Sequence, residues 1–211
     1  MRTASAADRS VIVVGGGPAG LASALALAAT DVPVTLAAGP PRPGGFDRDR
    51  RTAALFAGSI ELLRNLGVWD GLKDVCEPLK TIRLIDDTGR LFRAPEVKFN
   101  AHEAGLEAFG FNVPNDALVD ALSARVAATA GIAVVTTAGV QAVRIGQGRA
   151  TVVLGEGPEL SAPLAVAADG RKSPTRDAAG ITVKTWSYPQ TAIVTWFAHQ
   201  RPHDGISTEF H

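Results

Sequence analysis

Three glycines near the start of the chain have the spacing needed to hold a phosphate group. Gly15, Gly17 and Gly20 follow one another as G-x-G-x-x-G, directly after the apolar run Val11–Val14. In such a motif the first glycine permits a tight turn, the second lets a pyrophosphate approach the backbone, and the third lets helix and strand pack closely. Free backbone N–H groups and the positive end of a helix dipole would then bind the phosphates.

The elements on either side of the glycines are those that such a site requires. The run before them suits a buried strand, and an apolar helix pattern begins at Pro18, whose missing N–H costs nothing at a first helical position. A second strand over 32–38 completes a βαβ unit. Glycine-rich turns without function do occur, but the order of strand, motif and helix favours dinucleotide binding. The predicted phosphate-binding residues are Gly15, Gly17, Pro18, Ala19 and Gly20.

Composition excludes several other functions. The chain has 211 residues, with 21 basic and 21 acidic side chains and a formal net charge of zero. Such a balance gives no general attraction to nucleic acid or to an anionic membrane surface, so we expect no nucleic-acid partner. Cys76 is the only cysteine, which excludes an internal disulfide and a cysteine-rich metal site. The four histidines have no ligand spacing, and no metal is predicted.

The remaining pattern alternates strands and helices and then turns to strands, which indicates an α/β fold. Helices are predicted over 52–66 and 112–130, and a hairpin over 81–99 with its turn at 86–89. Trp186, Trp196 and Phe197 are expected to pack against a sheet rather than to stack on a substrate. Further strands are predicted over 132–136, 140–145, 151–154, 164–168, 181–186 and 191–198.

Several of these stretches together resemble the flavin-dependent aromatic hydroxylases of the para-hydroxybenzoate hydroxylase type, and within them the ubiquinone-biosynthesis hydroxylases. The matching stretches are IVVGGGPAGLASALAL, RTAALFAGSIELLRNLGVWDGL, LVDALSARV and AVAADGRKSPTRDAAGI. The resemblance implies a Rossmann-like FAD-binding domain formed by 1–80 and 98–180. It also implies part of an antiparallel-sheet substrate domain, formed by 81–97 and 181–211.

The same resemblance implies further cofactor contacts. Arg51 matches an arginine that contacts the flavin cofactor in such enzymes, and a guanidinium suits a phosphate or a ribose edge. Asp169 and Gly170 match a second fingerprint, whose aspartate contacts FAD and lies near the NAD(P)H path. An Asp-Gly turn without a ligand is the alternative. Arg176 is expected to anchor this loop or the pyrophosphate.

Two features depart from the family pattern. The second strand ends in Ala38 and Gly39, where an acidic residue for the adenosine ribose is expected, and Asp31 lies before that strand. One such charged hydrogen bond would contribute about 1.5–3 kcal/mol. Family members are also about twice this length, and their third FAD motif has no counterpart after Gly180. We therefore expect a fragment or a truncated product.

The resemblance implies an FAD-dependent monooxygenase that uses NAD(P)H and O₂ to hydroxylate an aromatic ring, here a polyprenylated phenol in ubiquinone biosynthesis. Two alternatives stay open: an FAD-dependent reductase or dehydrogenase of the same fold, and a truncated non-catalytic fragment. No catalytic residue and no oligomeric state are assigned. The expected location is cytoplasmic, with peripheral contact to the membrane or to ubiquinone-pathway enzymes, because the substrate would carry a lipid tail.

Overall fold

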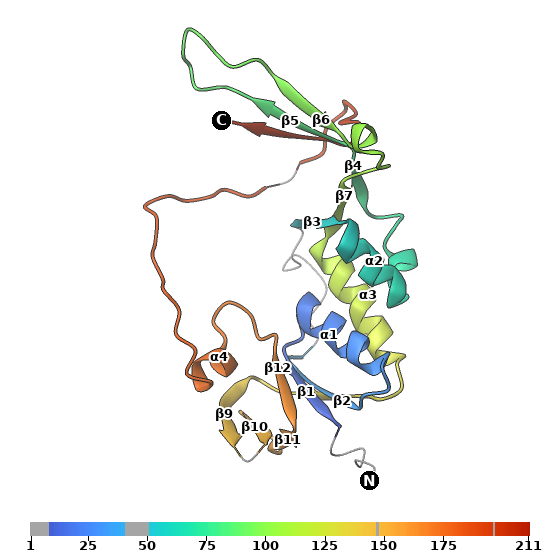
Figure 1. Ribbon diagram of the computed structural model, residues 1–211, viewed down its shortest axis with the longest axis vertical. Coiled ribbons are helices and arrows are strands. Elements are labelled where there is room, and N and C mark those ends of the chain that lie inside the picture. The colour runs from blue at the N-terminus through green and yellow to red at the C-terminus, as the bar shows by residue number, and fades with distance from the viewer. Residues whose placement is uncertain (1–8, 41–50, 147, 196) are drawn as a thin grey trace. The chain divides into compact units, whose positions relative to one another are not determined.

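A computed structural model of the chain describes residues 9–40, 51–146, 148–195 and 197–211 (Figure 1). The chain divides into two compact units, of which the first is formed by 1–48 and 119–191 and the second by 49–118 and 192–211. The domain boundaries expected from the sequence (80/81, 97/98 and 180/181) remain a prediction.

The first unit is built on a parallel sheet in the order β12-β1-β2-β8 (Figure 1). Its strands are β1 (Val11–Val14), β2 (Val34–Ala38), β8 (Ile132–Thr136) and β12 (Leu164–Ala167). β1 lies between β2 and β12 and pairs with both in parallel, with Val14 opposite Ala37 and Ala167. The chain passes from β1 through α1 to β2 on one side, and β12, about 150 residues later, pairs on the other side, so the strand order reverses at β1. Open α/β sheets bind their ligands at the carboxyl end of the strands at such a point.

The two faces of this sheet are covered by different elements. Helix α1 (Pro18–Ala28) packs on β1 and β2 and buries Leu21, Ala24 and Leu25. On the other face lies an antiparallel sheet of β9 (Val140–Gly146), β10 (Arg149–Leu154) and β11 (Leu160–Ala162). Residues of both sheets form one apolar cluster that includes Ile12, Val14, Ala37, Val143, Val152, Leu154 and Ala162. Such burial on both faces explains why β1 is a continuous apolar run.

Short helix α4 (Pro174–Ala178) follows β12 and lies against β9. Helix α3 (Asn115–Ala127) belongs to both units by sequence and buries Leu118, Leu122 and Val126, which are spaced by four residues. This spacing places the three side chains on one helical face, as the sequence predicted.

The second unit holds two small sheets, in the orders β3-β7-β4 and β13-β5-β6. Helix α2 (Ala57–Asn65) buries Ile60 and Leu63. Trp69 is buried too, and its ring meets that of Phe111 edge to face, with centroids 4.9 Å apart. The strands are β3 (Thr52–Phe56), β4 (Glu77–Leu79), β5 (Thr81–Ile85), β6 (Val97–Asn100), β7 (Gly110–Pro114) and β13 (Ile206–Phe210).

Three sequence expectations are corrected. The helix predicted over 52–66 begins only at Ala57, because Thr52–Phe56 pairs with β7 as a strand. The second strand of the predicted hairpin begins at Val97, since Asp86 holds residues 88–94 as a loop through hydrogen bonds from Thr88 and Ala94. The helix predicted to begin at 112 begins at Asn115.

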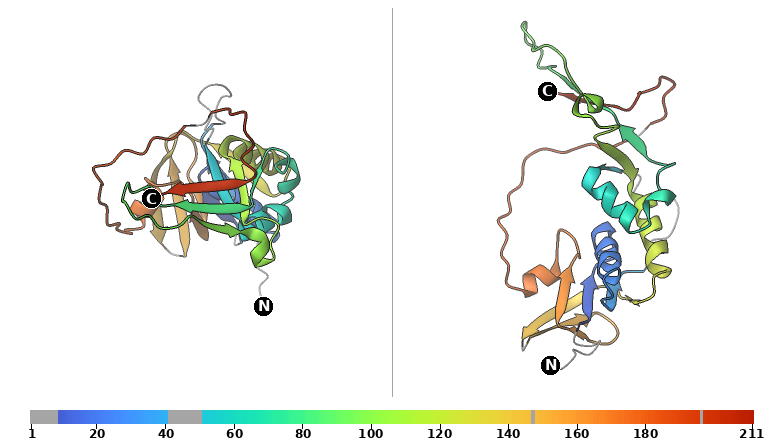
Figure 2. Two further views of the ribbon diagram at one scale, coloured as in Figure 1. Left: turned by 90° about the horizontal axis from the view of Figure 1, so that it is seen from above. Right: turned by 45° about the vertical axis from the view of Figure 1, so that its right-hand side comes forward.

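No strand forms over 181–186 or over the described part of 191–198, where the chain runs without helix or strand (Figure 2). Apolar strand-like residues need a partner strand to satisfy their backbone groups, and no described residue pairs with them. Trp186 and Phe197 are 64% and 74% exposed, so they do not pack against a sheet as predicted. Trp196 lies outside the described residues.

Candidate functional site

The glycine motif lies at the carboxyl end of β1, directly against the loop that follows β12. A Cβ on Gly15 would overlap the Ala168 carbonyl oxygen and lie 3.0 Å from the Asp169 backbone nitrogen. Gly15 also has φ +121°, which side chains rarely adopt. The first glycine is therefore required by the close approach of two segments about 150 residues apart in sequence.

The third glycine fixes the helix against the same turn. A Cβ on Gly20 would overlap the Gly15 carbonyl oxygen and come within 3.4 Å of the Ala168 Cβ. Gly20 is buried in the first turn of α1. Its hydrogen side chain lets the helix start directly on the turn, which is the packing role that the sequence predicted.

The second glycine faces open space. Gly17 is the N-cap of α1, no heavy atom lies within 4 Å of its position for a Cβ, and no side chain caps the helix there. Pro18 and Ala19 form the exposed first turn. An uncapped helix start with an open approach to its backbone can bind an anion, because the N–H groups and the helix dipole both favour negative charge.

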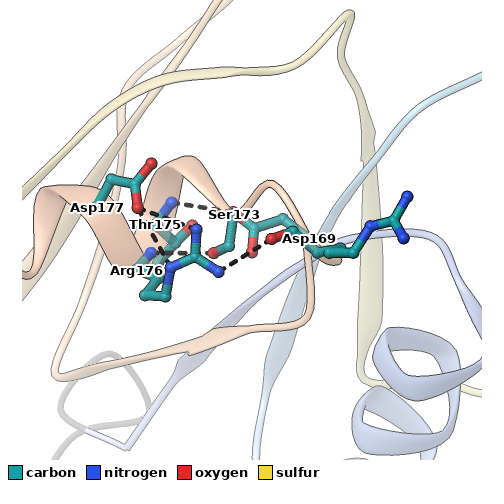
Figure 3. Close-up of polar contacts among 6 residues, drawn as sticks. Asp169, Ser173, Thr175, Arg176 and Asp177 are labelled. Carbon is teal, nitrogen blue, oxygen red and sulfur yellow. Dashed lines mark hydrogen bonds and ion pairs between the residues drawn. The ribbon is translucent and has the colours of Figure 1, made fainter. Parts of the chain in front are cut away.

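The loop after β12 is organised around Asp169. Its Oδ2 accepts a hydrogen bond from the Thr175 backbone N–H at 3.0 Å, whereas its Oδ1 is buried with no hydrogen-bond partner (Figure 3). Burial acts to raise the pKa of this carboxyl, but polar contacts with Ser173 and Thr175 outweigh it and hold the pKa below its ordinary value. Asp169 is thus held in its charged form, and its buried Oδ1 has no hydrogen-bond partner among the described residues.

Ser173 and Arg176 hold the same loop in shape (Figure 3). The Ser173 hydroxyl caps α4 by accepting from the Arg176 N–H at 3.0 Å. The Arg176 guanidinium donates to the Arg171 carbonyl at 3.0 Å and to Asp177 Oδ1 at 3.1 Å. In this structure the Arg176 donors serve the loop, and a contact with a pyrophosphate remains a prediction.

The structure brings most predicted site residues together. The glycine motif and the 169–176 loop meet at the end of β1. Gly170, with φ +90°, turns the chain within that loop. Arg51 is exposed in the second unit, just before β3, and its backbone carbonyl accepts from the Asn115 N–H at 2.9 Å. Its role toward a cofactor remains a prediction.

Sequence reasoning missed Thr175, which donates to Asp169 through its backbone and whose buried Oγ1 has no hydrogen-bond partner. A sequence signal for this contact was present, because Ser173 followed by Pro174 is a typical helix start. Such a start directs the N–H of the next residue, Thr175, toward the preceding loop. Among the described residues, no group of three or more His, Cys, Asp or Glu could hold a metal ion.

A family model described as "FAD binding domain" matches residues 8–207. The ubiquinone hydroxylase UbiL of Rhodospirillum rubrum is 33% identical over 204 residues, which cover 94% of this chain and 46% of that protein. The 3-demethoxyubiquinol 3-hydroxylase of Escherichia coli is 30% identical over 188 residues, covering 87% and 47%. The chain therefore spans about half the length of these curated relatives.

The fold is also that of solved flavoenzymes. The flavin-dependent monooxygenase PieE, solved in complex with FAD and substrate, superimposes with a TM-score of 0.65 at 21% identity. The match covers 81% of this chain and 32% of that one. The expected α/β class, a Rossmann-like domain of the para-hydroxybenzoate hydroxylase type, is confirmed.

Proposed function

The chain belongs to the family of FAD-binding domains, and from this premise we propose that it binds the FAD of an NAD(P)H-dependent monooxygenase that hydroxylates an aromatic ring. The observation that carries the proposal is the close packing of Gly15 and Gly20 against Ala168 at the carboxyl end of β1. That packing sets the start of α1 at the end of β1, where Gly17 has no side chain to cap the helix and nothing within 4 Å of its position for a Cβ. Such a helix start can bind a pyrophosphate through its backbone N–H groups.

The residues at this place fit the cofactor. The open backbone at Gly17 would receive the pyrophosphate, and Oδ1 of Asp169 would accept a hydrogen bond from a hydroxyl of the ribityl chain or ribose. FAD, when bound, supplies the electron transfer and oxygen chemistry. The work of this chain is to hold the phosphates, orient the cofactor and keep the 169–176 loop in one conformation.

The adenosine end would be bound without a carboxylate. β2 ends in Ala38, which is buried, and Asp31 lies in the turn before β2, at the far end of the strand. The ribose would depend on backbone groups or water. We expect the affinity for FAD to be lower than in a relative with an acid there, by about ten- to a hundredfold for a loss of about 1.5–3 kcal/mol.

For the substrate we propose a polyprenylated phenol of ubiquinone biosynthesis, because the curated relatives named above are ubiquinone-pathway hydroxylases. A lipid-tailed ring would bring the protein to the membrane periphery or to other enzymes of the pathway. Within the described residues, no helix has the length and apolar character to cross a bilayer.

The test has three measurements, made on the isolated chain and on an assembly of this chain with the other half of its relatives. Flavin absorbance and fluorescence titration measure FAD binding, NAD(P)H oxidation measures reduction, and mass analysis detects hydroxylated phenol. We expect FAD binding by the isolated chain and, in an assembly complete with the other half of its relatives, substrate-stimulated NAD(P)H oxidation with hydroxylated product. Oxidation without hydroxylated product would favour a reductase or dehydrogenase, and no FAD binding at any concentration would refute the proposal.

A further inference from the structure

The connection between β5 and β6 carries an exposed apolar tip, formed by residues 90–93 with the sequence Arg-Leu-Phe-Arg. Leu91 and Phe92 are 92% and 88% exposed, and so are among the most exposed large apolar side chains in the described part of the chain. Figures 1 and 2 show this connection extending past the ends of the two strands. Adjacent apolar side chains in such a position indicate an interaction site.

Cations stand on both sides of the two apolar residues. Arg90 precedes them, Arg93 follows them, and the tip itself contains no acid. Arg93 forms an exposed ion pair with Asp87 at 3.2 Å, and Glu96, beyond the tip, is paired with Lys98 at 3.0 Å. Arg90 forms no ion pair with another described residue. The tip is therefore locally positive, although the whole chain has a formal net charge of zero.

Hydrogen bonds fix the base of the same connection. The Asp86 carboxylate accepts from the Thr88 N–H at 3.1 Å and from the Ala94 N–H at 2.8 Å, which ties the two ends of the loop together. The Asp87 N–H donates to the His211 carbonyl at 2.6 Å, directly after β13. These contacts hold residues 86–94 as one loop with its tip in solvent.

We propose that the tip inserts into the surface of an anionic phospholipid bilayer. Leu91 and Phe92 would enter the boundary between headgroups and acyl chains, while the guanidinium groups of the flanking arginines stay at the phosphates. The use of such contact rests on the proposed function, since a polyprenylated phenol would lie in a membrane. The contact itself requires neither FAD nor substrate.

Two features favour a bilayer over a protein partner. Two side chains offer much less surface than the about 800 Å² per partner that a stable protein interface buries. A bilayer requires no complementary shape, because its acyl region accepts single apolar side chains and its phosphates accept hydrogen bonds from guanidinium groups on either side. Each cation near an anionic leaflet adds attraction, which salt screens.

The experiment measures co-sedimentation of the 211-residue chain with phospholipid vesicles, in the absence of FAD and of any phenol. Vesicles of phosphatidylcholine alone are compared with vesicles that also contain phosphatidylglycerol. We expect binding to the anionic vesicles to be about tenfold or more tighter than to the neutral ones, and to weaken as salt is added. Because no cofactor or substrate is present, this result and that of the FAD titration can fail separately.

A matched pair of variants locates the contact. Leu91→Ser combined with Phe92→Ser removes the apolar part of the tip. Ile193→Ser combined with Val194→Ser makes the same change at another adjacent pair, 90% and 68% exposed, with no Lys or Arg between 185 and 200. All four side chains are exposed, so both variants should keep the melting temperature of the parent. We expect the first variant alone to lose vesicle binding, by about tenfold or more.

A third variant tests the charge. Arg90→Gln combined with Arg93→Gln keeps the apolar pair and removes both cations. We expect it to bind the two kinds of vesicle with nearly equal affinity, because the attraction to the anionic leaflet is lost. The parent should then differ from it by about tenfold or more on the anionic vesicles only.

Several results would overturn the inference. They are no binding to anionic vesicles, an equal loss in the two serine variants, and an unchanged preference for anionic vesicles in the glutamine variant. Vesicle binding that disappears in an assembly with the other half of the relatives would show that polypeptide covers the tip. A dimer of the parent that the variant at 91 and 92 does not form would assign the tip to a second copy of the chain.

Discussion

A methyl group added at Gly17 would lie in open space, whereas one added at Gly20 would clash with the backbone. Substitutions at the two positions therefore distinguish an effect on FAD binding from an effect on folding. Gly17→Ala adds a methyl group to open space, so its free energy of unfolding should change by no more than about 1 kcal/mol. The methyl group would, however, stand where a pyrophosphate must approach. We expect FAD affinity to fall by about tenfold or more, measured by flavin fluorescence titration.

Gly20→Ala is the contrasting variant, because its methyl group would overlap the Gly15 carbonyl oxygen. The helix start must shift away from the turn. We therefore expect Gly20→Ala to lose FAD binding and to have a lower melting temperature than the parent. Equal FAD affinity of Gly17→Ala and the parent would place the phosphates elsewhere.

The lowered pKa of Asp169 predicts that the free energy of unfolding depends on pH. Its folded pKa lies below the ordinary value of 3.8, so the charged form is favoured by folding. The stability it contributes is present above pH 3.8 and is lost as the pH falls through the folded pKa. Asp169→Asn should therefore be less stable than the parent at pH 7, with a gap that narrows below pH 4. Urea unfolding across this range measures it.

Glu156→Gln serves as the control for charge, since Glu156 is an exposed acid in the same unit. The free energy of unfolding of Glu156→Gln should equal that of the parent across the pH range measured. A gap between Asp169→Asn and the parent that stays constant from pH 7 to pH 3 would mean that the Asp169 charge contributes nothing to folding.

At the scale of elements, the Asp86 carboxylate accepts three hydrogen bonds within the loop between β5 and β6. Asp86 accepts from the Thr88 N–H, the Thr88 hydroxyl and the Ala94 N–H, at 3.1, 2.7 and 2.8 Å. These hydrogen bonds, with that from Ala94 the largest, lower its pKa to about 2. Asp86→Ala should speed amide exchange over 86–96 and leave that of the first unit unchanged.

Asp87→Ala is the neighbour to compare, because the Asp87 side chain forms only an exposed ion pair with Arg93 among the contacts described. The amide exchange rates over 86–96 in this variant should stay close to those of the parent. Since the Asp86 pKa is about 2, the loop of the parent should also keep its protection down to pH 3. Loss of protection at pH 4 would show that another group holds it.

Elements were predictable from sequence where local pattern and tertiary packing agree. β1 and α1 are apolar runs joined by a glycine motif, and the structure keeps both within a residue of expectation. Residues 52–56 have a helical pattern continuous with α2, yet they form β3 because β7 offers backbone partners. Pairing with β7, a strand 50 or more residues away, is not visible in a local window.

For the candidate site, the sequence predicted the glycines and Asp169 but not how they depend on each other. The clash that a Gly15 side chain would make with Ala168 is a property of parallel pairing between β1 and β12. Thr175 was missed for a similar reason, because its role lies in a backbone N–H that any residue carries.

For the molecule as a whole, the segment 181–205 is where sequence and structure differ most. Its apolar residues were predicted as strands, but Ile193 is 90% and Val194 is 68% exposed, and the described part of the segment forms no helix or strand. β-Branched residues favour strands only when a neighbouring strand accepts their hydrogen bonds. Strands would form in this segment only if a partner strand paired with it, and the described residues contain no such strand.

This segment should be open to proteolysis. Lys184 is exposed in chain without helix or strand, whereas Arg64 and Arg125 lie in α2 and α3. A protease must bind an extended stretch, which is available at Lys184 but requires local unfolding in a helix. Trypsin should therefore cleave after Lys184 about tenfold or more faster than after either helical arginine. Mass spectrometry of a time course measures this, and Lys184→Gln should remove that fragment alone. Resistance at Lys184 equal to that of Arg64 and Arg125 would show that the segment is held in an ordered pairing.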